Sequence, residues 1–381
     1  MSDSIIIIAG EPSADMHGAA LVKELKKHDP ELMFYGIGSS LMQKAGVEIF
    51  TDLAQYAVIG FIEVLKHYPI FKKAFDLTLE KIQQIKPKAL ILIDYPGFNL
   101  RLAKKVKQLF PDIKIIYYIS PQVWAWGKKR IKLIEKIVDK MLVVFDFEAE
   151  LYQDNGIEAE FVGHPLMESI VLSKNKTELI KSKNLKLTDT IIALLPGSRQ
   201  IEVKRLLPVM LSSADKLHKQ MPEIKFLLIK AANIKEQAIA AYLKNYAHLP
   251  LNIISEHSYD FMSICSYAWV CSGTATLETA IIGIPMLITY KTSWLTWLMS
   301  KILIKLPYIG LVNIVAKKKI VPEFIQGQSN KNNIVNCTVN FLNQDSDFKH
   351  RQKQKLLSIK NKLGSGNVNQ NAAQAIIKTI H

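Results

Sequence analysis

The chain has 381 residues, of which 49% are hydrophobic and 22% are charged. This composition is typical of folded globular proteins and excludes a disordered chain, and the length favours two domains. The net charge of +15 favours an acidic partner, either phosphorylated substrates or an anionic membrane surface. No nucleic-acid partner is expected, because the lysines are scattered and no nucleic-acid-binding motif is present.

Cysteine usage and the N-terminal residues indicate a cytoplasmic protein. Cys265, Cys271 and Cys337 are odd in number and lack the spacing of a metal site, which favours a reducing compartment. Residues 1–13 lack the basic start and the long apolar core of a signal peptide. No stretch reaches the ~18 uninterrupted apolar residues that a membrane-spanning helix needs.

In the N-terminal half, short apolar runs alternate with helix-like stretches at 16–28 and 99–109. The expected strands are 5–10, 33–38, 89–94, 114–120 and 140–145. Near-continuous apolar strands that alternate with helices are typical of a parallel sheet covered on both faces.

A polar stretch at 173–189 interrupts this pattern, which then starts again. Further strands are expected at 191–197, 225–231, 251–255, 268–273 and 285–290. We therefore predict an α/β fold of two Rossmann-like, doubly wound parallel-sheet domains that face a cleft. The N-terminal domain spans 1–167 and the C-terminal domain spans 168–345. Helices over 346–381 are expected to pack back towards the N-terminal domain.

Three charged residues closely follow expected strands, namely Glu11, Asp94 and Arg199. In a doubly wound sheet, ligands bind outside the carboxyl ends of the strands. We therefore expect all three side chains at the cleft. The two carboxylates should lie side by side if the strands expected at 5–10 and 89–94 are neighbours.

A glycine turn in the C-terminal half indicates a nucleotide site. Ser272, Gly273 and Thr274 follow a strand and open an expected helix, whose N–H groups and positive dipole end suit a diphosphate. Glu278, one turn further on, is within reach of a ribose, and the planar guanidinium of Arg199 suits phosphate oxygens. Gly and Thr also cap helices that bind no ligand, so capping is the alternative for this turn.

Several longer motifs occur in a specific order along the chain. They are AGEPSAD at 9–15, AVIGFIEVL at 57–65, DYPGFN at 94–99, SPQVWAW at 120–126, GHPL at 163–166, LLPGSR at 194–199, SGTATLE at 272–278 and VN…VPEFIQ at 312–326. In these motifs, nearly the whole chain resembles the lipid-A-disaccharide synthases, inverting glycosyltransferases with the two-domain GT-B fold. One departure is that the family's Ser-Gly-Asp turn reads Ser13-Ala14-Asp15 here, and the Cβ of Ala resists a positive φ.

The resemblance implies a reaction that uses no cofactor. The enzyme would transfer 2,3-diacylglucosamine from its UDP derivative to the 6-hydroxyl of 2,3-diacylglucosamine 1-phosphate with inversion. The products would be UDP and the lipid A disaccharide 1-phosphate. No metal site is expected, because the only Asp-x-Asp motif, at 345–347, is not aimed by a strand.

Roles for single residues follow from matching the family motifs. Asp94 matches the family's proposed base, with a helix cap as the structural alternative and Glu11 as the rival base. Arg199 and the helix end at Thr274 would neutralise the leaving diphosphate. Expected acceptor contacts are Ser13, Asp15 and Asn99, and expected donor contacts are Ser272, Gly273, Glu278, Asn313, Gln326 and His164. For the last three, loop hydrogen bonding or a hinge position is the alternative.

Acylated substrates would require an apolar surface close to a bilayer. The residues expected there are Val58, Phe61, Ile62, Leu65, Phe71, Lys72, Lys73, Trp294 and Trp297. They combine apolar bulk with lysines, as interfacial helices do, although an amphipathic helix packed on the sheet has the same pattern. Together with the net charge, this predicts a peripheral protein on the cytoplasmic face of the inner membrane, in contact with anionic lipid.

Two other functions fit parts of the pattern. A UDP-N-acetylglucosamine epimerase would use the same nucleotide site without an apolar entry surface. A non-enzymatic nucleotide-lipid binding module would keep that site and would not need Asp94. The sequence leaves the oligomeric state open.

Overall fold

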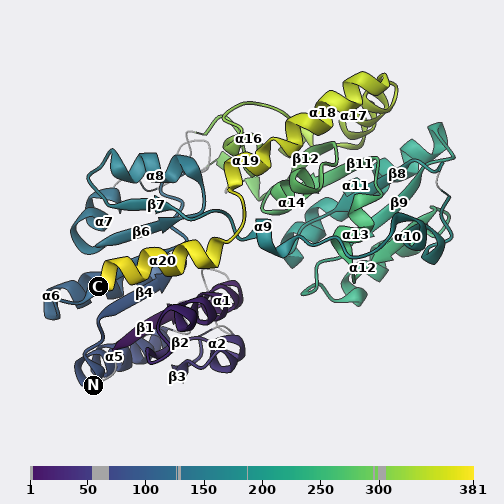
Figure 1. The fold of residues 1–381 in the computed structure, drawn as a ribbon. Coiled ribbons are helices and arrows are strands. Elements are labelled where there is room, and N and C mark those ends of the chain that lie inside the picture. The colour runs from purple at the N-terminus through teal and green to yellow at the C-terminus, as the bar shows by residue number, and fades with distance from the viewer. Residues whose placement is uncertain are drawn as a thin grey trace. The chain divides into compact units, whose positions relative to one another are not determined.

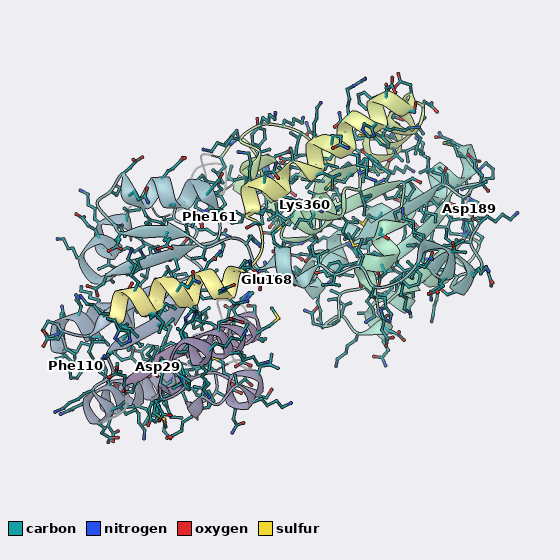
Figure 2. The ribbon with its side chains drawn as sticks, viewed as in Figure 1. Asp29, Phe110, Phe161, Glu168, Asp189 and Lys360 are labelled. Atoms are coloured by element: carbon teal, nitrogen blue, oxygen red, sulfur yellow. The ribbon has the colours of Figure 1, made fainter. Side chains whose placement is uncertain are left out.

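The computed structural model describes residues 3–53, 68–125, 127, 130–186, 188–294, 297–298 and 306–381. The chain forms two compact units (Figure 1). Unit 1 comprises Met1–Pro165 together with Leu363–His381, and unit 2 comprises Leu166–Lys362. Figure 2 labels Glu168, which follows the first crossing between the units, and Lys360, which precedes the second.

Unit 1 contains a seven-stranded parallel sheet in the order β3-β2-β1-β4-β5-β6-β7. The strands are β1 Ser4–Ala9, β2 Met33–Ile37, β3 Glu48–Thr51, β4 Ala89–Ile93, β5 Lys114–Tyr118, β6 Lys140–Val143 and β7 Ala159–Phe161. The helices are α1 Pro12–His28, α2 Ser40–Lys44, α5 Tyr68–Ile85, α6 Pro96–Leu109, α7 Ile131–Ile137, α8 Asp146–Gln153 and α20 Val368–Ile380.

Strand β1 shows why this sheet needs helices on both faces. Its isoleucines are fully buried and alternate in direction, as successive strand residues do. Ile5 and Ile7 share a core with α1 and α20, and Ile6 and Ile8 share a core with α5 and α6. The continuous apolar run IIII is therefore the pattern of a strand buried on both sides.

Unit 2 contains a six-stranded parallel sheet in the order β10-β9-β8-β11-β12-β13. The strands are β8 Ile191–Leu195, β9 Lys225–Ile229, β10 Leu251–Ile254, β11 Tyr267–Cys271, β12 Met286–Tyr290 and β13 Glu323–Ile325. The helices are α9 Leu166–Ser169, α10 Lys176–Ser182, α11 Gln200–Gln220, α12 Glu236–Leu243, α13 Ser258–Ser263, α14 Ala275–Ile282, α16 Leu311–Val315, α17 Lys331–Leu342 and α18 Ser346–Leu357, and α19 Ile359–Leu363 ends at the return to unit 1.

The predicted fold class is confirmed, because both sheets are parallel and doubly wound. In each sheet the strand order reverses next to its first strand, between β1 and β4 and between β8 and β11. Such switch points are where doubly wound sheets bind ligands. The predicted strands lie within two residues of the observed ones, whereas the edge strands β3, β7 and β13 were not predicted.

Residues 346–381, predicted to pack back towards the N-terminal domain, divide between the two units, and residues 363–381 do belong to unit 1. Helix α18 belongs to unit 2, and α20 belongs to unit 1. There, Ala372, Ala373 and Ile376 of α20 share a core with Leu21 and Leu25 of α1. Across the described part of the chain, no helix has both the length and the apolar character needed to cross a bilayer.

Candidate active site

At the switch point of unit 1, β1 and β4 run side by side, with Ala9 paired to Ile93. Glu11 and Asp94 follow these strands and therefore emerge at the same sheet edge. The predicted neighbourhood of the two strands is confirmed. The Glu11 carboxylate lies close enough to Tyr95 to add to the rise that burial causes in the pKa of the tyrosine.

Asp94 lies in an unusual backbone turn. Asp94 and Tyr95 both have φ of 46°, a left-handed conformation that costs energy for residues with a side chain. Tyr117 Oη donates to the Asp94 carbonyl at 2.5 Å, and Asn99 Nδ2 donates to the same oxygen at 2.7 Å. These two hydrogen bonds to the carbonyl hold the backbone of the turn in place. Burial raises the pKa of the Asp94 carboxyl, against a smaller opposing effect of the Tyr95 backbone N–H.

The carboxylate of Asp15 forms hydrogen bonds with backbone N–H groups at this edge of the sheet. Its Oδ1 accepts from the N–H groups of Ser39 at 2.6 Å and Met42 at 3.2 Å, and its Oδ2 accepts from Leu41 at 3.1 Å. The carboxylate therefore caps α2, as acidic side chains at helix N-termini do. Ala14 lies in the first turn of α1 and needs no positive φ.

Two half-buried histidines, His17 and His164, also belong to unit 1. Burial lowers the pKa of His17 to about 4, and burial together with His17 lowers that of His164 to about 4. Both rings are therefore neutral at neutral pH. The backbone N–H of His164 donates to the Leu363 carbonyl at 2.8 Å. The centroid of its imidazole ring lies 5.1 Å from that of the Phe145 ring.

At the switch point of unit 2, a cavity of about 650 Å³ opens at the carboxyl ends of β8, β9 and β11. This volume suits a nucleotide-sized ligand. The lining includes Gly197, Ser198, Arg199, Lys230, His257, Tyr259, Ser272, Gly273, Thr274 and Glu278. The predicted residues of the two glycine turns thus line one cavity.

The turn at Gly197 and the turn at Gly273 each require glycine, and the reasons differ. Gly197 has φ of 115°, and a Cβ there would lie 2.5 Å from Glu202 Oε2. Gly273 has φ of 146°, and no described atom lies within 4 Å of where its Cβ would be. The first glycine therefore permits close packing, and the second keeps the start of α14 open to a ligand.

The backbone at Arg199 is fixed while its side chain is exposed. Glu202 Oε2 accepts from the N–H groups of Ser198 at 3.1 Å and Arg199 at 3.2 Å. The Arg199 side chain is 78% exposed, and its Nη1 lies 3.6 Å from Glu202 Oε1. The guanidinium can therefore move to an anion in the cavity without disturbing the turn.

The part of the cavity lined by Glu278 contains two residues that sequence reasoning missed, Tyr259 and His257. Burial raises the pKa of Glu278, and a hydrogen bond from Tyr259 opposes that rise. Burial and Glu278 raise the pKa of Tyr259 to about 12. Tyr259 and His257 follow β10, so the end of that strand was the signal that could have located them.

Comparison with known proteins decides the family. The profile of the lipid-A-disaccharide synthetase family matches residues 5–379. The chain belongs to this family. A lipid-A-disaccharide synthase from Nitrosococcus oceani is 42% identical over 95% of this chain and 92% of the relative. One from Geobacter sulfurreducens is 39% identical over 100% of this chain and 98% of the relative.

Solved structures resemble the chain in fold alone. The UDP-GlcNAc 2-epimerase from Neisseria meningitidis, bound to UDP-GlcNAc, has a TM-score of 0.66 at 12% identity, covering 98% of this chain and 100% of that one. The S. aureus protein MnaA, determined with UDP, has a TM-score of 0.68 at 11% identity, covering 99% and 97%. Family membership makes the chain an enzyme, a glycosyltransferase of lipid A biosynthesis. It rules out the epimerase and the non-enzymatic alternatives.

Within this synthase fold, three residues expected to contact the acceptor or donor support the backbone. Asn99 is 0% exposed and donates to the carbonyls of Ile93 and Asp94. Asn313 is also 0% exposed. Its Nδ2 donates to the Val321 carbonyl and to the Glu323 carboxylate, and its Oδ1 accepts from the backbone N–H groups of Ile320 and Val321. These contacts occupy the amide NH2 groups of both asparagines, as backbone N–H groups occupy the carboxylate of Asp15, and direct substrate contact by the three stays a prediction. Polar motif residues here often hold the turns that carry the site.

Ser272 and Gln326 are also occupied by loop contacts. Ser272 Oγ donates to the Ile309 carbonyl at 2.8 Å. Gln326 accepts from the N–H of Thr292 at 3.0 Å and donates to its carbonyl at 3.2 Å. Ser13 is exposed in the first turn of α1. His164 belongs to unit 1 and does not line the cavity of unit 2, so its donor contact stays a prediction.

The expected membrane surface is only partly described. Val58, Phe61, Ile62 and Leu65 lie outside the described residues. Phe71 needs a correction, because it is half-buried against the core and its ring lies 6.3 Å from that of Tyr95. Lys72 and Lys73 are exposed, Trp294 is 69% exposed, and Trp297 is half-buried.

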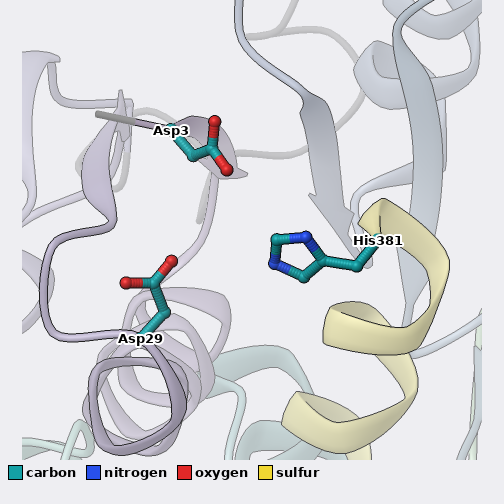
Figure 3. A group of neighbouring side chains, drawn as sticks. All are labelled: Asp3, Asp29 and His381. Atoms are coloured by element: carbon teal, nitrogen blue, oxygen red, sulfur yellow. The ribbon is translucent and has the colours of Figure 1, made fainter. Parts of the chain in front are cut away.

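Two groups of acidic residues resemble a metal site, and within the described residues both lie away from the cavity. Asp345 Oδ1 accepts from Phe348 N at 2.6 Å, so Asp345 caps α18. In Figure 3, Asp3, Asp29 and His381 surround a common space, and one ligand atom of each lies within 4.8 Å of the others. This group lies at the amino edge of the unit 1 sheet, opposite Asp94, and Asp3 forms an ion pair with Lys88.

Proposed function

We propose that the enzyme transfers 2,3-diacylglucosamine from its UDP derivative to the 6-hydroxyl of 2,3-diacylglucosamine 1-phosphate, with inversion. Unit 1 would supply the base and the acceptor contacts, and unit 2 would bind the UDP-sugar. The observation that carries this proposal is that each switch point presents the chemistry for one half of the reaction. Carboxyl groups follow β1 and β4, and an arginine with a helix start follows β8 and β11.

Asp94 would act as the general base. As its carboxylate takes the proton of the 6-hydroxyl, the oxygen forms a bond to the anomeric carbon of the donor. The bond from that carbon to the diphosphate breaks on the opposite side, which inverts the configuration. A base with a raised pKa transfers protons more effectively, provided that it is ionised at the working pH. Glu11 and Ser13 would contact the acceptor beside it.

The leaving diphosphate would be stabilised without a metal ion. Arg199 would pair with phosphate oxygens, and the N-terminus of α14 at Thr274 would face the same group. Glu278 would accept from the ribose hydroxyls while Tyr259 orients its carboxylate. Stabilisation of developing charge by groups already in place can lower the barrier by several kcal/mol.

A direct transfer assay tests this function. The purified chain, given radiolabelled UDP-2,3-diacylglucosamine and the diacyl acceptor phosphate, is expected to form the tetraacyl disaccharide phosphate and UDP. EDTA is expected to leave the rate unchanged. Epimerised donor in the absence of acceptor, or loss of transfer with EDTA that Mg²⁺ restores, would contradict the proposal.

We also propose that the enzyme contacts anionic lipid on the cytoplasmic face of the inner membrane. The net charge of +15 and the exposed Trp294, which follows Lys291 closely in the sequence, support this contact. Charge attracts a protein to anionic headgroups, and aromatic side chains insert at the interface. The exposed Lys72 and Lys73 of α5 would add to the attraction.

Vesicle sedimentation at rising salt tests the membrane contact. Binding to phosphatidylglycerol vesicles is expected to fall only partly at about 1 M NaCl, because salt screens charge and not apolar insertion. Trp294→Ser is expected to lower the fraction that resists salt. Leu109→Ser, at another exposed apolar residue (49% exposed), is the matched control and should bind as the wild type does. Complete release at moderate salt would contradict insertion.

A further inference from the structure

Two buried side chains of α8, Glu148 and Tyr152, form hydrogen bonds with the loop that follows β5. Glu148 Oε1 accepts from the indole N–H of Trp124 at 2.8 Å, and Tyr152 Oη donates to the Pro121 carbonyl at 3.2 Å. Glu148 and Tyr152 are four residues apart, so they lie on the same face of the helix. One side of a short helix therefore fixes both ends of the segment from Pro121 to Trp124.

Trp124 begins a row of aromatic rings along the carboxyl edge of the unit 1 sheet. Its ring meets Phe147 edge to face at 5.4 Å, Phe147 stacks on Phe145 at 5.5 Å, and Phe145 contacts His164 at 5.1 Å. These residues follow β5, β6 and β7, and β5 is paired with β4, which carries Asp94. The row thus starts on the loop that follows the strand paired with β4, at the same edge of the sheet as the proposed base.

The carboxylate that holds Trp124 is buried, and one of its oxygens also caps α8 through the Phe145 N–H. Glu148 is 1% exposed and is held by N–H donors from Trp124 and from the Phe145 backbone. Burial raises the pKa of its carboxyl to about 7. An apolar residue of similar volume would generally pack here at lower cost. Carboxyl groups perturbed in this way are concentrated at functional sites.

The hydrogen bond to Glu148 also determines what Trp124 can offer a ligand. Because the indole N–H points inward to Glu148, the half-buried ring presents apolar surface at the sheet edge. The apolar face of a sugar ring packs on such a surface, and a ring held by a hydrogen bond loses little entropy when it binds.

We propose that Glu148 is a positioning residue, which holds Trp124 so that the indole forms a platform for the sugar ring of the acceptor beside Asp94. This inference rests on the proposed function. Trp124 would contact the acceptor directly, and Glu148 would affect acceptor binding only by holding Trp124 in position.

Steady-state kinetics with each substrate varied in turn test the platform. Trp124→Ala is expected to raise the acceptor KM about tenfold and to leave the donor KM unchanged. Glu148→Leu should produce the same change, because it releases the ring. Glu148→Gln keeps an oxygen for the indole N–H and is expected to restore an acceptor KM within about twofold of the wild type. Glu150→Gln, at an exposed position of the same helix, is the matched control.

The double variant Trp124→Ala/Glu148→Leu distinguishes positioning from a general effect on folding. If Glu148 acts through Trp124, the double variant should be no worse than Trp124→Ala alone. Should Glu148→Leu not fold, Trp124→Phe breaks the same hydrogen bond from the other side and should also raise the acceptor KM.

Three results would overturn the inference. They are additive effects in the double variant, equal changes in both KM values, and an unchanged acceptor KM in Trp124→Ala. Absence of transfer by the wild-type enzyme in the same assay would instead refute the proposed function on which the inference rests.

Discussion

Replacement of Asp94 by Asn is expected to lower kcat by about 10²–10⁴-fold, because the amide cannot take the proton of the acceptor hydroxyl. The Asp94 backbone carbonyl, which Tyr117 and Asn99 hold, is unchanged by this substitution. The turn should therefore persist, and UDP binding in unit 2 should stay normal. Transfer rates at saturating substrates, together with calorimetric titration of UDP, measure the two effects.

A pH–rate comparison separates Asp94 from Glu11 as the base. The raised pKa of Asp94 predicts that wild-type activity falls as the pH drops through that pKa. This acid limb should vanish in the residual activity of Asp94→Asn and persist in Glu11→Gln. Asp112→Asn, at an exposed position at the other edge of the sheet, is the control. The opposite pattern would make Glu11 the base.

Replacement of Arg199 by Ala is expected to lower kcat by more than about 10²-fold and to weaken UDP binding. The reason is that the guanidinium faces a cavity of nucleotide size and would stabilise the charge that develops on the leaving diphosphate. The Glu202 contacts to the backbone of Ser198 and Arg199 do not involve the arginine side chain, so the turn should survive. Rapid-quench kinetics and calorimetry with UDP measure the loss.

Two further variants sharpen the interpretation of Arg199. Arg199→Lys keeps the charge and loses the planar fork, so it should recover only part of the activity. Arg351→Ala removes an exposed arginine from α18 of the same unit and should leave kcat unchanged. A near wild-type rate for Arg199→Ala would make Arg199 a surface residue and leave the diphosphate without its proposed partner.

The sequence predicted the fold well because burial leaves a clear pattern. Strands such as β1 and β4 are buried at every position and almost entirely apolar, since helices cover both faces of the sheet. The ends of those strands then located Glu11, Asp94 and Arg199. The edge strands β3, β7 and β13 have only three or four residues and expose part of each, so their apolar pattern was too short to recognise.

The roles of polar motif residues were harder to predict. A motif gives the identity of a residue and not the direction of its side chain. Asp15, Asn99 and Asn313 turn towards backbone groups and support the turns that carry the site. Tyr259 was missed for the opposite reason, because it lies in no recognised motif and reaches the cavity only through the pairing of distant strands.

The return of α20 to unit 1 has a consequence for how the chain folds as it leaves the ribosome. Ala372, Ala373 and Ile376 cover apolar residues of α1, which are synthesised long before them. The N-terminal unit therefore cannot complete its core until α20 has been synthesised, by which time the C-terminal unit is already fully synthesised. An apolar groove along α1 must wait for some 340 residues to be added, and during that time it is a natural target for chaperones.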